Sequence, residues 1–261
     1  MIGVKTMTKS ALHNELSKDQ PGLPAGLEAK DRLAVALDFP SAAGAFDLVD
    51  RLEGACQWLK VGMELYYAAG NGLVEALRGR GYSVFLDLKL HDIPNTVAGA
   101  VRSVTGAGAG LLTVHAGGGA AMMRAAAEAA DLPGGPKLLA VTVLTSMDAA
   151  ELAEVGVTAS PGNQVLLLAR LAQAAGIDGM VCSGGEVEAL RKRMGPETML
   201  VVPGIRPAGS DVGDQRRVTT PEEAIARGAS MLVVGRPITK AVDPGAAARA
   251  ILQEIERAAA G

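Results

Sequence analysis

The sequence contains few of the residues that mark several common protein classes. Only two of its 261 residues are cysteines, and Cys56 and Cys182 lie far apart without the spacing of a metal site, so we expect reduced cytosolic thiols. Aromatic residues make up only 3% of the chain, which argues against a base-stacking surface. Lys and Arg number 25 against 28 Asp and Glu, which argues against a basic footprint for nucleic acid or anionic lipid.

Long apolar runs are also missing. None approaches the ~20 residues that a membrane helix needs, and the N-terminal stretch lacks the apolar centre of a signal peptide. We therefore expect a cytoplasmic protein that binds neither nucleic acid nor a membrane. With 49% hydrophobic and 20% charged residues, the chain has an ordinary globular composition and enough length for one substantial core.

The order of apolar runs predicts the fold. Residues 1–30 are polar and Pro-containing, and we expect a loosely ordered or partly helical extension there. In residues 31–261, short apolar runs alternate with longer Ala- and Leu-rich runs. The expected strands are 33–38, 57–62, 83–89, 110–116, 137–145, 179–183, 198–204 and 230–235. The expected helices are 41–53, 64–80, 95–107, 118–130, 163–175, 185–194, 221–227 and 244–258.

Eight strand–helix units without a break in composition predict one α/β domain, a (β/α)8 TIM barrel over residues 31–261. The nearly continuous apolar strands are typical of parallel strands that are covered on both faces. A doubly wound open sheet is the alternative fold. The G-x-G-x-x-G loop of a dinucleotide site does not follow the first strand, which disfavours that alternative.

One strand carries unexpected charge. In VFLDLKLHDIPNT, residues 84–96, Asp87 and Lys89 are two residues apart and should point to the same face of the strand. Charged side chains are rarely buried unless they are paired, so this is either a structural salt bridge or a charged active site. Lys60 lies in a neighbouring apolar strand, and its ammonium group needs a carboxylate partner if it is buried. Asp87 is the obvious candidate.

Polar residues gather where the predicted strands end. In TIM barrels the C-terminal strand ends carry the active site. The polar residues at these ends are Asp38, Lys60, Asp87, Lys89, Asp92, His115, Thr145, Ser146, Arg206 and Arg236. For two of them a structural role is the competing interpretation: Asp38 as a helix cap and His115 as a hydrogen-bonded structural histidine.

The loops after the seventh and eighth strands resemble a phosphate site. Such loops often hold phosphate in TIM barrels, and Gly235 is followed by Arg236, whose guanidinium suits an anion. Arg206 lies in the neighbouring loop. The alternative is that Gly235 only turns the chain and Arg236 is a solvated charge. Residues 204–218 are rich in Gly and Asp, and we expect a mobile lid over the phosphate.

These motifs resemble the orotidine 5′-phosphate decarboxylase family. LDLKLHDIPNT is similar to the family's D-x-K-x-x-D-I-P-x-T signature, and LAVALDFP, WLKVG, LTVHA, VLTS, VPGIRP and VVGRPIT follow in the family's order from about residue 31. The resemblance implies a homodimer of (β/α)8 barrels that converts orotidine 5′-monophosphate into UMP and CO2 in pyrimidine biosynthesis. It also implies that neither a metal ion nor an organic cofactor takes part.

The resemblance assigns a role to each site residue. Lys89 would protonate C6 of the pyrimidine, and Asp87 would face the departing carboxylate. Lys60 and Asp92 complete a charged tetrad. The residues implied to reach the partner's active site are Asp92, Ile93 and Thr96. The residues implied to bind the substrate are Asp38 and Lys60 at the ribose, Thr145 and Ser146 at the pyrimidine edge, and Gln215, Gly235 and Arg236 at the phosphate, with Pro203 and Arg206 close by.

Two other functions stay open at this point. A metal-dependent sugar-phosphate enzyme, such as a 3-keto-L-gulonate 6-phosphate decarboxylase, has a similar charged strand end, but the DIPNT continuation and Gln215 favour the nucleotide enzyme. A non-catalytic barrel that binds a phosphate ligand needs an anion site and has no use for the charged tetrad.

Overall fold

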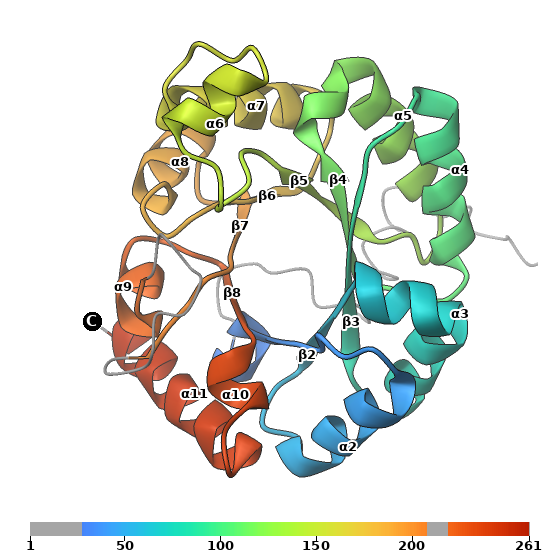
Figure 1. Cartoon of the computed structure of the whole chain (residues 1–261), viewed down its shortest axis with the longest axis vertical. Helices are drawn as coiled ribbons and strands as arrows, with labels where there is room; N and C mark the ends of the chain where they lie inside the picture. The colour runs from blue at the N-terminus through green and yellow to red at the C-terminus, as the bar shows by residue number, and fades with distance from the viewer. Residues whose placement is uncertain (1–27, 208–218, 261) are drawn as a thin grey trace, which may run out of the picture.

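The strands close into one parallel barrel (Figure 1). The computed structural model describes residues 28–207 and 219–260. All eight predicted strands are present, each hydrogen-bonded to the next, with β8 closing onto β1. They are β1 (Leu33–Ala36), β2 (Trp58–Gly62), β3 (Ser83–Leu90), β4 (Leu111–His115), β5 (Lys137–Val141), β6 (Gly179–Val181), β7 (Met199–Val202) and β8 (Met231–Val234). The (β/α)8 prediction is confirmed, and the doubly wound alternative is wrong.

The helices surround this barrel in the predicted order. The eight predicted helices all form, with ends within two residues of expectation. They are α2 (Ala42–Leu52), α3 (Met63–Gly79), α4 (Pro94–Thr105), α5 (Gly119–Ala130), α7 (Pro161–Ala174), α8 (Val187–Met194), α9 (Pro221–Ala226) and α11 (Pro244–Ala260). Four short elements were not predicted: η1 (Ala29–Arg32), η2 (Ala116–Gly118), α6 (Ala149–Glu154) and α10 (Arg236–Thr239). Most of the predicted extension, residues 1–27, lies outside the described residues.

Local sequence signals account for the helix ends. Thr220 and Glu223 form a reciprocal capping box at the start of α9, with Pro221 in its first turn. Asp148 and Glu151 form a second capping box, which explains why the six residues of α6 are helical at all. Glycines with φ between 77° and 99° follow four helices, as predicted, at Gly81, Gly108, Gly176 and Gly228.

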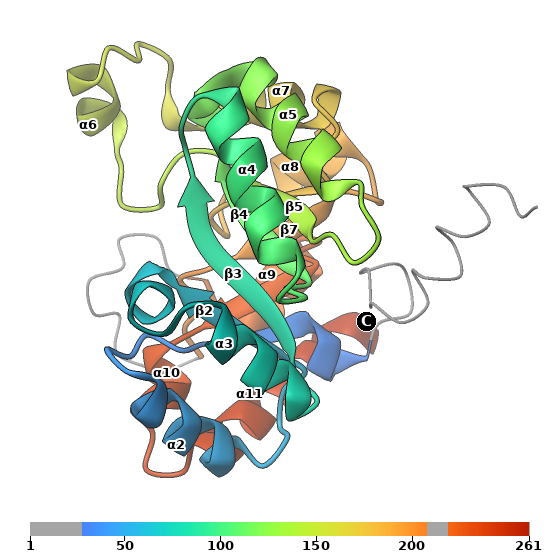
Figure 2. The ribbon, with the colours of Figure 1, turned by 90° about the vertical axis from the view of Figure 1, so that its right-hand side faces the viewer.

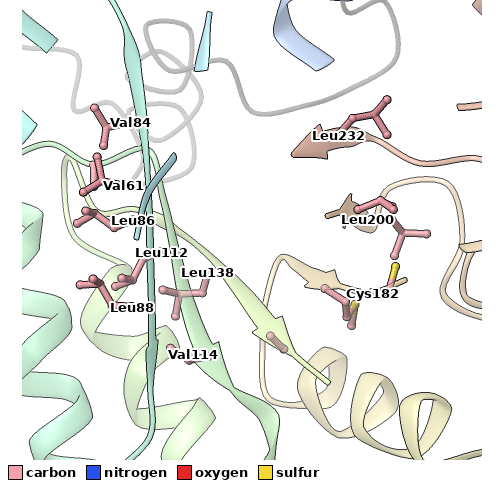
Figure 3. Packing of buried hydrophobic residues seen from close by; sticks show 14 of the residues in the cluster. Val61, Val84, Leu86, Leu88, Leu112, Val114, Leu138, Cys182, Leu200 and Leu232 are labelled. Atoms are coloured by element: carbon pink, nitrogen blue, oxygen red, sulfur yellow. The ribbon is translucent and has the colours of Figure 1, made fainter. Parts of the chain in front are cut away.

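The hydrophobic core has two layers. The larger layer lies between the strands and the helices, and Figure 3 shows part of it around Val61, Leu86 and Leu112. The smaller layer, here called the inner cluster, fills the barrel itself. Its members are Ala34, Ala36, Trp58, Phe85, Leu111, Leu139, Met199, Val201, Met231 and Val233. Because side chains alternate along a strand, the next inward positions on β1 to β4 are Asp38, Lys60, Asp87 and Thr113. The inner cluster therefore lies directly below these polar residues inside the barrel.

Both cysteines belong to the packed interior. Cys56 and Cys182 are free and buried, and burial raises the pKa of the Cys56 thiol to about 12. These thiols are therefore unreactive core residues. In the described part of the chain, no helix is both long and apolar enough to cross a membrane. The cytoplasmic location stays a prediction.

Candidate active site

Four charged side chains form one row across the C-terminal ends of β1 to β3. Lys60 Nζ lies 3.2 Å from Asp38 Oδ1 and 3.6 Å from Asp87 Oδ2. Lys89 Nζ lies 2.8 Å from Asp87 Oδ1. The row, here called the charged row, thus alternates in sign as Asp38, Lys60, Asp87 and Lys89. The predicted partnership of Lys60 with Asp87 is confirmed, and Asp38 joins it from the opposite side.

Burial and charge act against each other at Asp87. Burial by itself would raise the pKa of Asp87, but the ammonium groups of Lys60 and Lys89, together with hydrogen bonds from Lys89 and Thr113, outweigh it and lower that pKa. Lys60 is 9% exposed, and burying its ammonium is tolerable because carboxylates face it on both sides. The charged row therefore holds its charges in place inside a largely apolar barrel.

Lys89 has an unusual backbone. Its φ is 49°, in the left-handed region that non-glycine residues rarely adopt. The register between β3 and β4 shifts between Leu86 and Leu90, so Lys89 lies in an irregularity of the sheet. Its backbone N–H donates to the side-chain hydroxyl of Thr113 on β4 at 2.8 Å. Sequence reasoning did not single out Thr113. The signal that could have found it is a polar residue at an inward-facing position of the apolar strand LLTVH.

Two glycines lie against the charged row. A Cβ atom at Gly62 would lie 3.3 Å from Lys60 Nζ, which is tighter than an ordinary contact, and 3.5 Å from Asp38 Oδ1. A Cβ atom at Gly235 would lie 3.6 Å from Asp38 Oδ2. Gly235 precedes α10, so the end of β8 lies beside Asp38. The structure therefore brings the candidate phosphate loop next to the charged row.

The interpretation of Asp38 as a helix cap is wrong. The residue that caps α2 is Ser41, whose side chain accepts the N–H of Gly44 at 3.5 Å. The Asp38 carboxylate instead accepts a hydrogen bond from Lys60. Asp38 is thus free of a helix-capping role and available to a ligand at the barrel mouth.

The other predicted residues of the phosphate side lie around the ends of β7 and β8. Arg206 is buried, and its Nη1 donates to the Ile205 carbonyl at 2.8 Å. Pro203 directly follows β7 and is half-buried, whereas Arg236 begins α10 and is exposed. Gln215 and residues 208–218 of the predicted lid lie outside the described residues.

Thr145 and Ser146 lie in the turn after β5, half-buried and exposed respectively. The turn leads into α6, which projects from the body of the barrel (Figure 2). Thr145 and Ser146, which are predicted to contact the pyrimidine, would therefore approach it from a loop above the barrel and not from inside the barrel.

The segment that follows β3 faces outward. Asp92, Ile93 and Thr96 are all exposed, and Asp92 Oδ1 accepts the N–H of Ile93 at 2.6 Å. With the other described residues of this chain Asp92 makes no salt bridge, so a single chain does not bring it into the charged row.

The two histidines near Lys89 pack on each other. The rings of His91 and His115 stack with centroids 5.0 Å apart, and His115 Nδ1 accepts the N–H of Gly117 at 3.2 Å. Burial, reinforced by His91 and Lys89, lowers the pKa of His115. The structural interpretation of His115 agrees with this geometry. Among residues 28–207 and 219–260, His, Cys, Asp and Glu form no group of three that could hold a metal ion.

The chain is similar to known proteins over most of its length. The sequence model of the family described as Orotidine 5′-phosphate decarboxylase / HUMPS matches residues 31–251. Proteins named orotidine 5′-phosphate decarboxylase from Nitrosococcus oceani and Moorella thermoacetica are 53% and 54% identical to the chain, covering 87% and 88% of it and 98% and 94% of their own lengths. The crystal structure of orotidine 5′-phosphate decarboxylase from Lactobacillus acidophilus matches with a TM-score of 0.77 and 40% identity, covering 86% of this chain and 99% of that one.

Proposed function

The chain belongs to the orotidine 5′-phosphate decarboxylase / HUMPS family, and from this premise we propose how its residues decarboxylate orotidine 5′-monophosphate to UMP and CO2. The reaction is a step of pyrimidine biosynthesis. The observation that carries the proposal is the charged row at the mouth of the barrel, with Lys89 at its end and Asp87 between two ammonium groups.

Lys89 supplies both positive charge and a proton. When the bond from C6 to the carboxyl carbon breaks, its electron pair stays on C6, which the pyrimidine ring delocalises poorly. An ammonium group already fixed by a 2.8 Å ion pair stabilises that charge without having to reorganise during the reaction. A proton then passes from Lys89 Nζ to C6 to give UMP, and solvent returns a proton to Lys89.

Asp87 acts on the same step. Its Oδ1 pairs with Lys89 and aims the ammonium, and we assign it the position facing the departing carboxylate. The carboxylates of Asp87 and of the substrate repel each other more in the bound substrate than in the transition state, where negative charge has moved to C6. This difference would favour the reaction.

The rest of the substrate would extend toward β8. Asp38 and Lys60 are assigned to the ribose hydroxyls, and Gly235 and Arg236 to the phosphate together with Gln215. The proximity of Gly235 to Asp38 supports this order, because ribose and phosphate are neighbours in the nucleotide. The remaining assigned contacts are Thr145 and Ser146 at the pyrimidine, with Pro203 and Arg206 near the phosphate side.

We further propose a homodimer in which Asp92, Ile93 and Thr96 complete the partner's active site. Large apolar side chains are exposed on α3 and just before α4. These two helices follow each other around the barrel (Figures 1 and 2). Ile93, just before α4, is 66% exposed, and on α3 Met63 is 43% and Tyr67 77% exposed. Such grouped exposure favours a covered interface. Asp92, beside Ile93, would then join the charged row of the partner, because within a single chain Asp92 is not part of that row.

The variant Ile93→Asp tests the dimer. A carboxylate placed in an apolar contact costs several kcal/mol without a partner, so we expect monomers in sedimentation and a loss of activity that deepens on dilution. Leu132→Asp, a change at a leucine that is 47% exposed after α5, is the matched control and should remain dimeric and active. An Ile93→Asp protein that stays dimeric would contradict this interface, and a monomeric wild type would contradict the dimer.

Turnover of orotidine 5′-monophosphate with a chelator present tests the activity. Loss of orotidylate absorbance should proceed at the same rate with and without excess EDTA, because Lys89 supplies the positive charge that a metal-dependent relative takes from its cation. Activity that disappears on chelation and returns with a divalent cation would favour the sugar-phosphate alternative. Tight UMP binding without any turnover would favour a ligand-binding barrel. The relatives named decarboxylase, 53% to 55% identical, disfavour both outcomes.

A further inference from the structure

Thr113 lies beneath the charged row and touches two of its members. It is the inward-facing residue of β4 between Leu111 and His115, and no part of it is exposed. Its hydroxyl oxygen accepts the backbone N–H of Lys89 at 2.8 Å. The same hydroxyl donates to Asp87 Oδ1 at 3.1 Å. One buried side chain thus connects the backbone of Lys89 with the carboxylate that pairs with the Lys89 ammonium.

The Thr113 hydroxyl both donates and accepts a hydrogen bond. A hydroxyl has a single proton to donate, and in Thr113 that proton points to Asp87 while the oxygen receives Lys89. Asp87 Oδ1 accepts from both Thr113 and Lys89 Nζ, which leaves Oδ2 on the side of Lys60. The Thr113 hydroxyl therefore orients the Asp87 carboxylate plane.

The backbone of Lys89 needs this support. With φ at 49°, a residue that carries a side chain is strained, and such conformations persist only where surrounding contacts impose them. The irregular register between β3 and β4 brings the Lys89 N–H to a side-chain hydroxyl of β4. Loss of that acceptor would let Lys89 relax toward ordinary strand geometry and shift its ammonium. A displacement of about 1 Å at a reacting group can cost roughly 100-fold in rate.

We propose that Thr113 is a positioning residue of the decarboxylation, whose hydroxyl holds Lys89 in its left-handed conformation and fixes Asp87 so that the ammonium points at C6. The inference rests on the proposed function, since it takes Lys89 as the group that serves C6. Thr113 itself does not touch the reacting atoms. Its effect should therefore appear in the chemical step rather than in nucleotide affinity.

Thr113→Val and Thr113→Ser separate the hydroxyl from the shape of the side chain. Valine keeps the volume and removes both hydrogen bonds, so kcat should fall by about 10- to 100-fold, while the Kd for UMP, which has no carboxylate to lose, stays within about threefold. Serine retains the hydroxyl and should restore kcat to within about threefold of wild type. Thr113→Ala is measured beside them and should match valine, which keeps the test decisive if the valine variant does not fold.

Thr198→Val is the matched control. Thr198 is another buried threonine, next to the start of β7 at the opposite end of the barrel, and its hydroxyl donates to the Met194 carbonyl at 3.0 Å. The same chemical change there should lower thermal stability and leave kcat unchanged. An activity loss that merely followed stability would affect both valine variants alike.

Three results would overturn the inference while leaving the proposed function standing. They are a Thr113→Val enzyme as fast as wild type, a Thr113→Ser enzyme as slow as the valine variant, and a loss of UMP affinity as large as the loss of kcat. A wild-type protein that does not decarboxylate orotidine 5′-monophosphate would instead remove the proposed function itself.

Discussion

Lys89→Ala should abolish turnover and leave the barrel folded. General acid catalysis typically contributes about 10²- to 10⁴-fold and a preorganised charge about 10²- to 10³-fold, so removing both from one residue should cost roughly 10⁴- to 10⁷-fold in kcat. The fold should survive, because the Lys89 side chain is 30% exposed and Asp87 keeps its ion pair with Lys60. Single-turnover decarboxylation, with enzyme in excess over substrate, measures the loss.

Two further variants make that result specific. Lys192→Ala removes an exposed lysine from α8 and should leave activity unchanged. Lys89→Arg keeps a positive charge but cannot release a proton, because guanidinium does not deprotonate in proteins, and it should also be inactive. Residual decarboxylation by Lys89→Ala within about 100-fold of wild type, less than a general acid alone contributes, would refute the assignment of Lys89.

Arg236→Ala should weaken binding of phosphorylated ligands far more than binding of the bare nucleoside. A hydrogen bond to a charged group contributes about 1.5–3 kcal/mol, so the Kd for UMP should rise roughly 10- to 150-fold. The Kd for uridine should change by less than about twofold, because uridine lacks the group that Arg236 contacts. Isothermal titration calorimetry with both ligands gives the comparison.

Arg249→Ala provides the control for this experiment. Arg249 is an exposed arginine on α11 that pairs with Glu53, and its removal should alter neither affinity. If Arg236→Ala weakened UMP and uridine equally, Arg236 would not belong to the phosphate site.

Much of the site was predictable because burial and alternation constrain it. A charged residue inside an apolar strand needs a partner, and this requirement alone linked Lys60 to Asp87 before any geometry was known. The eight apolar runs located every strand, although β5 ends at Val141, four residues before the predicted end. Parallel strands bring their C-terminal ends to one face of the barrel. Asp38 shows where single-residue reasoning stops. Its position fits a helix cap equally well, and only the contact with Lys60 decides between the two roles.

Other features depend on contacts that the sequence does not display. The left-handed Lys89 and its bond to Thr113 arise from an irregular register between β3 and β4, whereas sequence reasoning assumed regular alternation. The roles of Asp92, Ile93 and Thr96 require a second copy of the chain, and Gln215 lies outside the described residues. The helix α6 had a readable signal in its capping box, Asp148 and Glu151, that was not used.

The backbone of Lys89 sets folding against chemistry at a single position. Glycine adopts a φ of 49° without steric cost, so the residue best suited to that backbone has no ammonium to offer the substrate. A laboratory screen for heat-resistant variants that scores folding alone would therefore select glycine at position 89 and yield folded proteins without decarboxylase activity. Engineering a more robust version of this enzyme requires that every round of selection also score catalysis.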